Sequence, residues 1–245
     1  MRLAFRLLWL LGLILFCVPL HLLWRLFRMR SPWPQRFLGW TGRAVGMKVT
    51  VVGTPARQPT LYAANHQSWI DILVLGGATG ASFVSKESVR RWPVAGWLAT
   101  MVGTIYISNS DRSAAADQAG AIRNALHKGK SVAFFPEGRL DNGELLPFRP
   151  ALFGAVIPPD HHQPILIQPV AIDYGEARDE VIWPSRTKAG KNAIQVMSRR
   201  GTANVTLTFL EPFTPESEHH RRDAATHAET AIADALGIET AREAA

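Results

Sequence analysis

Residues 60–75 read TLYAANHQSWIDILVL and combine a predicted strand, a polar junction and a predicted helix. Residues 60–64 are uncharged and carry aromatic and branched side chains, which predicts a short strand. The apolar run that follows predicts a helix over 70–75. The strand then delivers His66 to the edge of a sheet, and Asp71 lies about one helical turn further along the chain.

This spacing brings a carboxylate within reach of an imidazole. Asp71 can turn back to one ring nitrogen of His66, which fixes the tautomer, leaves the other nitrogen as a proton acceptor and stabilises an imidazolium. Such a pair is a general base without its own nucleophile, suited to activating a substrate hydroxyl. A histidine that caps the helix through its neighbours is the alternative, and the spacing alone does not separate the two.

A second stretch of this kind is FFPEGR, residues 134–139. A buried strand that ends in Pro-Glu-Gly places the Glu137 carboxylate and the flexible backbone of Gly138 at the sheet edge, near His66 if the two strands are neighbours. The alternative is an ordinary turn with an exposed glutamate. Three cations are candidates to bind a phosphate or carboxylate there, although each of them taken alone is more often a solvated surface charge: Lys86, Arg139 and Arg149.

The rest of the chain alternates between expected strands and helices. This order predicts an α/β fold with a mixed sheet flanked by helices. It also predicts three parts: a membrane segment over 1–45, a catalytic domain over 46–215 and a C-terminal surface helix within 216–245. The expected strands are 48–52, 60–64, 81–85, 104–107, 131–135, 165–172 and 203–210, and the expected helices are 70–75, 94–101, 113–127, 150–157 and 222–236.

The composition excludes several classes of protein. With 47% apolar residues and 19% charged residues, the chain can bury a substantial core and is not a disordered tail. Its single cysteine excludes a disulfide scaffold and a structural Cys₄ or Cys₂His₂ zinc site. The sequence has no GxGxxG, GxxxxGK[ST], GxSxG or HExxH motif. The pairs at 161–162 and 219–220 are the only adjacent histidines, and no matching carboxylates surround them, so we expect no metal.

The first 70 residues carry nine basic and no acidic residues, whereas the remaining 175 carry 18 basic and 20 acidic ones. This charge brackets an uncharged run over 7–24, LLWLLGLILFCVPLHLLW, and favours anionic lipid over nucleic acid as the partner. The double basic flank is explained best by a membrane-embedded helical hairpin that continues through 33–45, with SPWP at 31–34 as its turn. A single spanning helix and a cleaved signal peptide remain alternatives, although the small-x-small cleavage site is missing.

The two motifs, NHQSWID at 65–71 and FFPEGR at 134–139, together resemble the phospholipid/glycerol acyltransferases, typified by bacterial 1-acylglycerol-3-phosphate acyltransferase. The resemblance extends over about 61–174 and is supported by FVSKE at 83–87, WPVAGW at 92–97, LPFR at 146–149 and QPVA at 168–171. It implies that His66 is the catalytic base and Asp71 its partner. It also implies that these residues contact the acceptor: Lys86, Glu137, Gly138 and Arg139.

The sequence departs from the family pattern at two places. The second motif usually reads GxxF[IV]DR, but here GTIYI at 103–107 is followed by Ser-Asn, and Arg112 is displaced by three residues. The third motif usually continues as FPEGT[RT]S, but here it reads FPEGRLD. Both changes fall where an acceptor phosphate would bind. The remaining candidate cations for that phosphate are Lys86, Arg112, Arg139 and Arg149.

The expected function is acyl transfer from a thioester, on coenzyme A or acyl carrier protein, to the free hydroxyl of a lysolipid. The favoured acceptor is 1-acyl-sn-glycerol 3-phosphate, and the alternatives are a different acceptor such as a lyso-ornithine lipid or glycerol 3-phosphate itself. No cofactor is expected beyond the acyl donor, and the enzyme should lie at the cytoplasmic membrane with its catalytic domain facing the cytoplasm. A lipid-binding protein without activity is a rival that has no need of the His66–Asp71 base, and a serine hydrolase using Ser68 fails on geometry.

Overall fold

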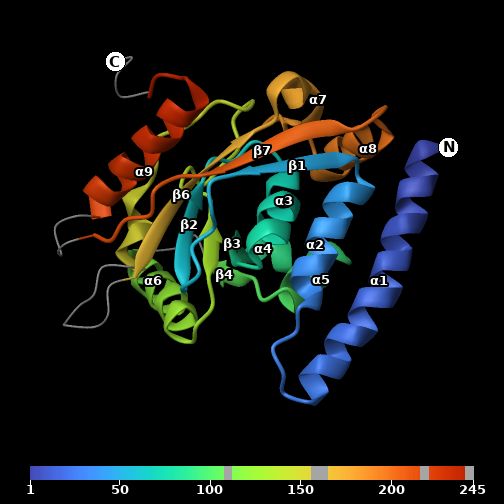
Figure 1. Cartoon of the computed structure of the whole chain (residues 1–245), viewed down its shortest axis with the longest axis horizontal. Helices are drawn as coiled ribbons and strands as arrows, with labels where there is room; N and C mark the ends of the chain where they lie inside the picture. The colour runs from blue at the N-terminus through green and yellow to red at the C-terminus, as the bar shows by residue number, and fades with distance from the viewer. Residues whose placement is uncertain (108–111, 156–164, 216–220, 241–245) are drawn as a thin grey trace.

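The computed structural model describes residues 1–107, 112–155, 165–215 and 221–240; the side chains of 112–118 and 155 lie outside this description. Within these residues the chain forms three layers, a central seven-stranded sheet with helices on both faces (Figure 1). The predicted α/β class is confirmed.

The elements follow the predicted alternation closely. The strands are β1 (Met47–Val52), β2 (Thr60–Ala64), β3 (Ser82–Lys86), β4 (Ile105–Ile107), β5 (Val132–Phe134), β6 (Leu166–Asp173) and β7 (Ala203–Phe209). The α-helices are α1 (Arg2–Leu26), α2 (Trp33–Ala44), α3 (Ile70–Thr79), α4 (Glu87–Arg90), α5 (Ala95–Met101), α6 (Arg112–His127), α7 (Arg178–Val181), α8 (Ala189–Ser198) and α9 (Arg221–Leu236), and the 3₁₀ helices are η1 (Pro150–Ala155) and η2 (Gly175–Ala177).

The strand order of the sheet is β1-β7-β6-β2-β5-β3-β4. Strands β6, β2, β5, β3 and β4 are parallel to one another, and β7 pairs antiparallel with β6 and parallel with β1. The sheet is therefore mixed, as predicted. Because β2 lies between β5 and β6, the chain segments that follow these three strands meet at one edge of the sheet.

Alternate side chains of β2 point to opposite faces and enter two separate apolar clusters. Tyr62 and Ala64 lie in a cluster that the helices α1, α2, α3 and α8 cover. Leu61 and Ala63 lie in a second cluster with the side chains of α6, η1 and α9. The central strand is thus buried on both faces, which holds its carboxyl end in place.

Helices α1 and α2 pack together as a hairpin that lies along one side of the molecule (Figure 1). Arg6 fixes α1 to the domain, because its buried guanidinium donates to the carbonyls of Val196, Met197 and Gly201 at the end of α8. The hairpin shape agrees with the sequence, but the predicted turn at 31–34 is displaced. Helix α2 already begins at Trp33, since a proline such as Pro34 is tolerated in the first turn of a helix.

Four segments differ from the predicted elements. Helices α4, α7 and α8 are not among the expected helices, and the segment from Pro150 forms a 3₁₀ helix instead of an α-helix. In α8 the side chain of Asn192 is fully buried, where it accepts from Trp69 Nε1 and donates to the Ile182 carbonyl. A buried polar residue at an inward position conceals the apolar periodicity by which a helix is recognised.

Candidate active site

The residues that the sequence singles out come together at the carboxyl edge of the parallel strands. His66 follows β2, and Glu137 follows the neighbouring β5. On the other side of β2, Tyr174 directly follows β6. Asn65 joins β2 to β6, because its side-chain amide donates to the Ile172 carbonyl at 2.9 Å and accepts from the Ile172 N–H at 2.7 Å. The edge is therefore rigidly tied at the point where His66 leaves the strand.

His66 and Asp71 form the predicted pair. His66 Nδ1 lies 2.8 Å from Asp71 Oδ2, with 17% of the histidine side chain and none of the aspartate exposed. The His66 ring stacks on Phe135, with ring centroids 3.9 Å apart. Within the described part of the chain, Nε2 has no hydrogen-bond partner. An Nδ1–H donated to Asp71 therefore leaves Nε2 as the nitrogen that can accept a proton.

The Asp71 carboxylate also receives three further hydrogen bonds. The backbone N–H groups of Gln67 and Ser68 donate to Oδ2 at 2.7 and 2.8 Å, and the Tyr174 hydroxyl donates to Oδ1. These donors fix the position of the carboxylate, and hydrogen bonds to a charged acceptor are stronger than neutral ones. Burial, followed by the charge of Asp71, raises the pKa of Tyr174 well above its usual value, so the phenol remains a donor.

Glu137 is 1% exposed and connects the two motifs. Its Oε1 accepts the backbone N–H of His66 at 2.7 Å, and its Oε2 accepts the N–H of Leu146 at 3.2 Å. Burial raises the pKa of Glu137 to about 8, and these two N–H donors oppose the shift. Both carboxyl oxygens thus hold the backbone around the site. Contact of Glu137 with an acceptor stays a prediction.

Gly138 forms the corner of this loop with a φ of 70°, a region that favours glycine. The exposed guanidinium of Arg149 lies directly over it, because a Cβ at Gly138 would be 3.1 Å from Arg149 Nη1. Arg139 is also exposed, and its Nη2 lies 3.7 Å from Asp141 Oδ2. The loop therefore presents two cations and one carboxylate to solvent beside the buried glutamate.

The two other candidate cations are less closely placed. Lys86 is the exposed last residue of β3, which is separated from β2 by β5. It lies at the same sheet edge as His66 but shows no contact with it. Arg112 begins α6, and its side chain lies outside the described residues. The roles of both residues in binding stay predictions.

Two further residues shape the site without having been predicted. Tyr174 lies 103 positions from Asp71, and no local pattern indicates their contact. Phe135 directly precedes the Pro-Glu-Gly loop, so its position beside His66 was available from the strand pairing but not from either motif alone. Ser68 is fully buried, and its hydroxyl donates to the Val181 carbonyl at 2.7 Å, which agrees with the rejection of a serine nucleophile.

No cluster of three or more histidine, cysteine, aspartate or glutamate residues that could hold a metal ion occurs among the described residues. The histidine pairs at 161–162 and 219–220 lie outside the described residues. The contacts at the site suit an imidazole base oriented by a buried carboxylate, next to a loop with exposed arginines.

Relatives of known name share both the sequence and the fold. The chain is 34% identical over 218 residues to a lyso-ornithine lipid O-acyltransferase of Pseudomonas aeruginosa, which covers 84% of this chain and 80% of the relative. It is 38% identical over 110 residues to a 1-acyl-sn-glycerol-3-phosphate acyltransferase of Neisseria gonorrhoeae, 43% of each chain. The crystal structure of PlsC from Thermotoga maritima, an LPA acyltransferase, has the same fold, with a TM-score of 0.67, 21% identity and 97% of each chain covered.

A family model described as Acyltransferase matches residues 48–173, from β1 to the end of β6. This range contains the His66–Asp71 pair and the Pro-Glu-Gly loop, and it covers more than half of the chain. The chain therefore belongs to the phospholipid/glycerol acyltransferase family and is an acyltransferase.

Proposed function

We propose that this enzyme transfers a fatty acyl group from a thioester to the hydroxyl of a lysolipid, with His66 as the general base. The observation that carries this proposal is the free Nε2 of a histidine whose Nδ1 lies 2.8 Å from a buried, multiply hydrogen-bonded aspartate. The acceptor hydroxyl gives its proton to Nε2 as its oxygen attacks the thioester carbonyl. The tetrahedral adduct then collapses to an ester, and the departing thiolate takes the proton from the imidazolium.

The surroundings of His66 support this cycle. The Asp71 charge stabilises the imidazolium that forms after proton transfer, and the Phe135 ring beneath the imidazole limits its orientation. The Glu137 carboxyl group holds the His66 backbone N–H, so both ends of the residue are restrained. A base whose position is already restrained needs little reorganisation to reach the reacting geometry.

The acyl donor is proposed to be acyl coenzyme A or acyl carrier protein. In either case the acyl group arrives as a thioester, and the reaction balances as thioester plus alcohol to ester plus thiol. This chemistry requires a base and donors for the oxyanion, and it needs no metal ion or further cofactor.

We propose a lyso-ornithine lipid as the acceptor. The relative named for that substrate matches 84% of this chain, whereas the relative named for 1-acyl-sn-glycerol 3-phosphate matches 43%. An ornithine head group offers both a carboxylate and an amine. The Pro-Glu-Gly loop carries complementary charges, since the guanidinium of Arg139 lies beside the carboxylate of Asp141. The missing Asp-Arg of the second family motif also favours an acceptor without a phosphate.

An assay of purified enzyme with labelled acyl donor against both acceptors tests this proposal. We expect a higher kcat/KM with lyso-ornithine lipid than with 1-acyl-sn-glycerol 3-phosphate. The Asp141→Asn variant should raise the KM for the lyso-ornithine lipid by about two- to fivefold, because exposed ion pairs contribute little individually, and should not impair binding of a phosphate acceptor. Transfer to 1-acyl-sn-glycerol 3-phosphate alone would contradict the acceptor but not the reaction; transfer to neither would contradict the reaction.

The phosphate acceptor is the second candidate, and the two arginines on the loop favour it. Arg139 and Arg149 are both exposed beside Gly138, where they could form charge-assisted hydrogen bonds to a phosphate. If that acceptor is the natural one, Arg139→Ala should raise its KM by about tenfold or more, since such bonds contribute roughly 1.5–3 kcal/mol each. The same variant should change the donor KM little.

The Tyr174→Phe variant tests whether the tyrosine positions the His66–Asp71 pair. Removing the hydroxyl deletes one of the donors to Asp71 while keeping the ring in the core. We expect kcat to fall by about tenfold, as a lost bond to a buried charged group costs roughly 1.5–3 kcal/mol, with both KM values unchanged. The kcat–pH profile should change as well, because the Tyr174 hydroxyl contacts the carboxylate that holds His66. Unchanged kcat and an unchanged profile would show that Tyr174 is merely structural.

The membrane location is proposed from α1 and its charges. Helix α1 has 25 residues, about 38 Å long, and among the described residues it is the one helix long and apolar enough to cross a bilayer. Since Arg6 ties it to α8, we propose that the α1–α2 hairpin embeds from the cytoplasmic side of the cell membrane, where acyl thioesters occur. Digestion of the catalytic domain by protease added to intact spheroplasts would contradict this orientation.

A further inference from the structure

The segment 90–97, RRWPVAGW, joins α4 to α5 and exposes large apolar side chains. Trp92 is 39% exposed, Val94 60% and Trp97 50%. In this segment Gly96 alone is buried. Soluble surfaces rarely gather this many large apolar side chains in one short segment, and such patches mark interaction sites.

The backbone of this segment is held in a strained, well-defined shape. Val94 has a φ of 57°, a value that β-branched residues rarely adopt. Gly96 is packed so closely against α4 that a Cβ would lie 2.3 Å from the Arg90 carbonyl oxygen. The Gly96 carbonyl in turn accepts the hydroxyls of Thr100 and Tyr106 at 2.8 and 3.0 Å. The apolar side chains are thus presented outward by a rigid turn, and strain of this kind occurs where a surface is used.

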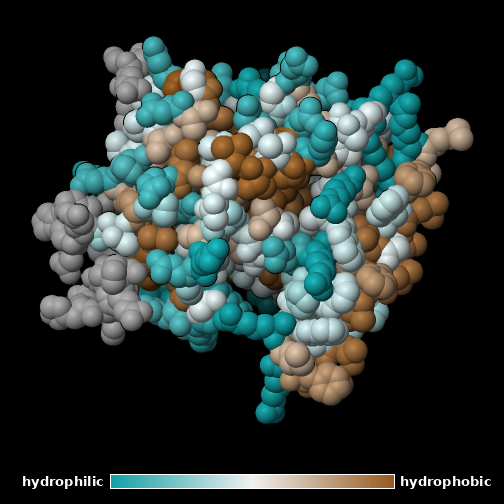
Figure 2. Space-filling model, in the orientation of Figure 1, coloured by the Kyte–Doolittle hydropathy of each residue, from teal (hydrophilic) through white to brown (hydrophobic). Residues whose placement is uncertain are grey.

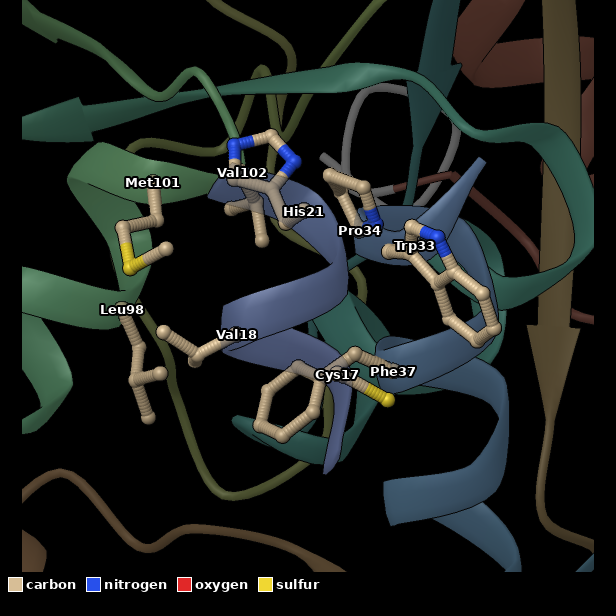
Figure 3. A pocket seen from close by; sticks show the side chains of 9 residues that line it. All are labelled: Cys17, Val18, His21, Trp33, Pro34, Phe37, Leu98, Met101 and Val102. Carbon is tan, nitrogen blue, oxygen red and sulfur yellow. The ribbon is translucent and has the colours of Figure 1, made fainter. Parts of the chain in front are cut away.

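Segment 90–97 lies next to the contact between α5 and the α1–α2 hairpin. Leu98 and Met101 of α5, and Val102 directly after it, line an apolar pocket together with side chains of α1 and α2 (Figure 3). Trp97 precedes Met101 by four residues within α5, so this exposed residue lies on the same helix face as a pocket residue. The residues that α1 and α2 contribute to this pocket are Cys17, Val18, His21, Trp33, Pro34 and Phe37.

On its outer side, α1 exposes a long row of apolar side chains, which appears as brown atoms along the right edge of the molecule in Figure 2. Leu15 and Phe16, for example, are 66% and 52% exposed. The exposed apolar side chains of segment 90–97 thus lie near a helical hairpin whose outer face is also apolar.

The composition of segment 90–97 matches a lipid interface in particular. Tryptophan is enriched where a bilayer meets water, because its ring is apolar and its N–H is polar. Arg90 and Arg91 are exposed beside the tryptophans, and Lys86 is exposed one short helix earlier. Arg90 pairs with Glu87 at 3.4 Å, which leaves the segment with a net positive charge that suits anionic lipid.

We propose that segment 90–97 is a second bilayer-contacting element, which inserts Trp92, Val94 and Trp97 into the interface of an anionic membrane beside α1. Together the two elements would hold the end of β3, where Lys86 lies, against the lipid surface. This inference rests on the membrane association in the proposed function, and the experiment separates the two.

The experiment places a fluorescent label at single cysteines in the full chain. In a Cys17→Ala background, a polarity-sensitive nitrobenzoxadiazole dye is attached to Val94→Cys, to Leu15→Cys as the positive control, and to Ile238→Cys as the matched negative control. Ile238 is 44% exposed and follows α9, on the opposite side of the molecule from α1 (Figure 1). Each protein is mixed with vesicles of phosphatidylglycerol and phosphatidylcholine, with and without nitroxide-labelled lipid.

On vesicles, the emission maximum of the dye at position 94 should shift to shorter wavelength, and nitroxide lipid should quench its emission, as at position 15. The emission of the dye at position 238 should not change. Quenching at position 15 without quenching at position 94 would overturn this inference and leave the membrane anchor standing. Absence of quenching at both positions would overturn both. A label at position 94 that is shielded by acyl carrier protein but not by vesicles would also overturn it, in favour of a protein-binding surface.

Discussion

Replacing His66 by alanine is expected to abolish acyl transfer almost completely. Among the residues that the structure describes, this imidazole is the one group at the sheet edge that is both held by a buried carboxylate and left with a free nitrogen. General base catalysis by a positioned side chain contributes roughly 10²–10⁴-fold, so kcat should fall by that factor. The measurement is a single-turnover assay with labelled acyl donor, compared with thermal unfolding of the same preparation.

The fold should survive this change, because the bond between the His66 backbone and Glu137 does not involve the imidazole. The matched control is His227→Ala. His227 is an exposed histidine on α9 whose ring meets that of Phe213 edge to face, and its replacement should leave full activity. Added imidazole should restore part of the activity of His66→Ala, since the ring would fill the space left above Phe135. Retention of more than about a tenth of wild-type activity would exclude His66 as the base.

Replacing Asp71 by asparagine should have an effect of similar size for a different reason. The amide oxygen can still accept the N–H groups that Oδ2 accepts now, and the Tyr174 hydroxyl can rotate to accept from the amide nitrogen. The side chain therefore fits, but its charge is gone, and the imidazolium loses its stabilisation. We expect kcat to fall by about 10²–10⁴-fold with little change in KM.

The double variant Asp71→Asn/Tyr174→Phe tests whether the asparagine at position 71 keeps a hydrogen bond to Tyr174. In Asp71→Asn the tyrosine is needed as an acceptor, so the double variant should lose stability beyond the sum of the two single variants. Thermal unfolding of the four proteins gives that coupling. If Asp71→Asn keeps its activity, or loses it only through a raised KM, the proposed role of the carboxylate is wrong.

Much of the fold could be predicted because its signals are local. The strand over 60–64 agrees with the structure at both ends, and the strand that leads to Pro-Glu-Gly lies within the predicted range. The spacing of His66 and Asp71 pointed to their contact, since residues five apart at a strand–helix junction are close in space. The apolar run near the N-terminus likewise predicted α1.

Other parts of the site could not be predicted, because they depend on strand order. Glu137 reaches the backbone of His66 because β5 pairs directly with β2. From the sequence, this contact was expected only if the two strands were neighbours. Tyr174 reaches Asp71 because β6 lies on the other side of β2. No sequence motif or periodicity predicts either contact, because the partners are 71 and 103 positions apart in the chain.

Local patterns in the sequence predicted the alternation that produces an α/β sheet and the proximity of His66 to Asp71. These properties depend on residue types and on spacings of a few positions, for which backbone geometry fixes the outcome. The tertiary structure alone decided how the base is restrained, which carboxyl groups are buried, and that segment 90–97 faces outward next to the hairpin. Those features arise from packing between segments far apart in the chain, and burial is a property of the whole fold that no local pattern contains.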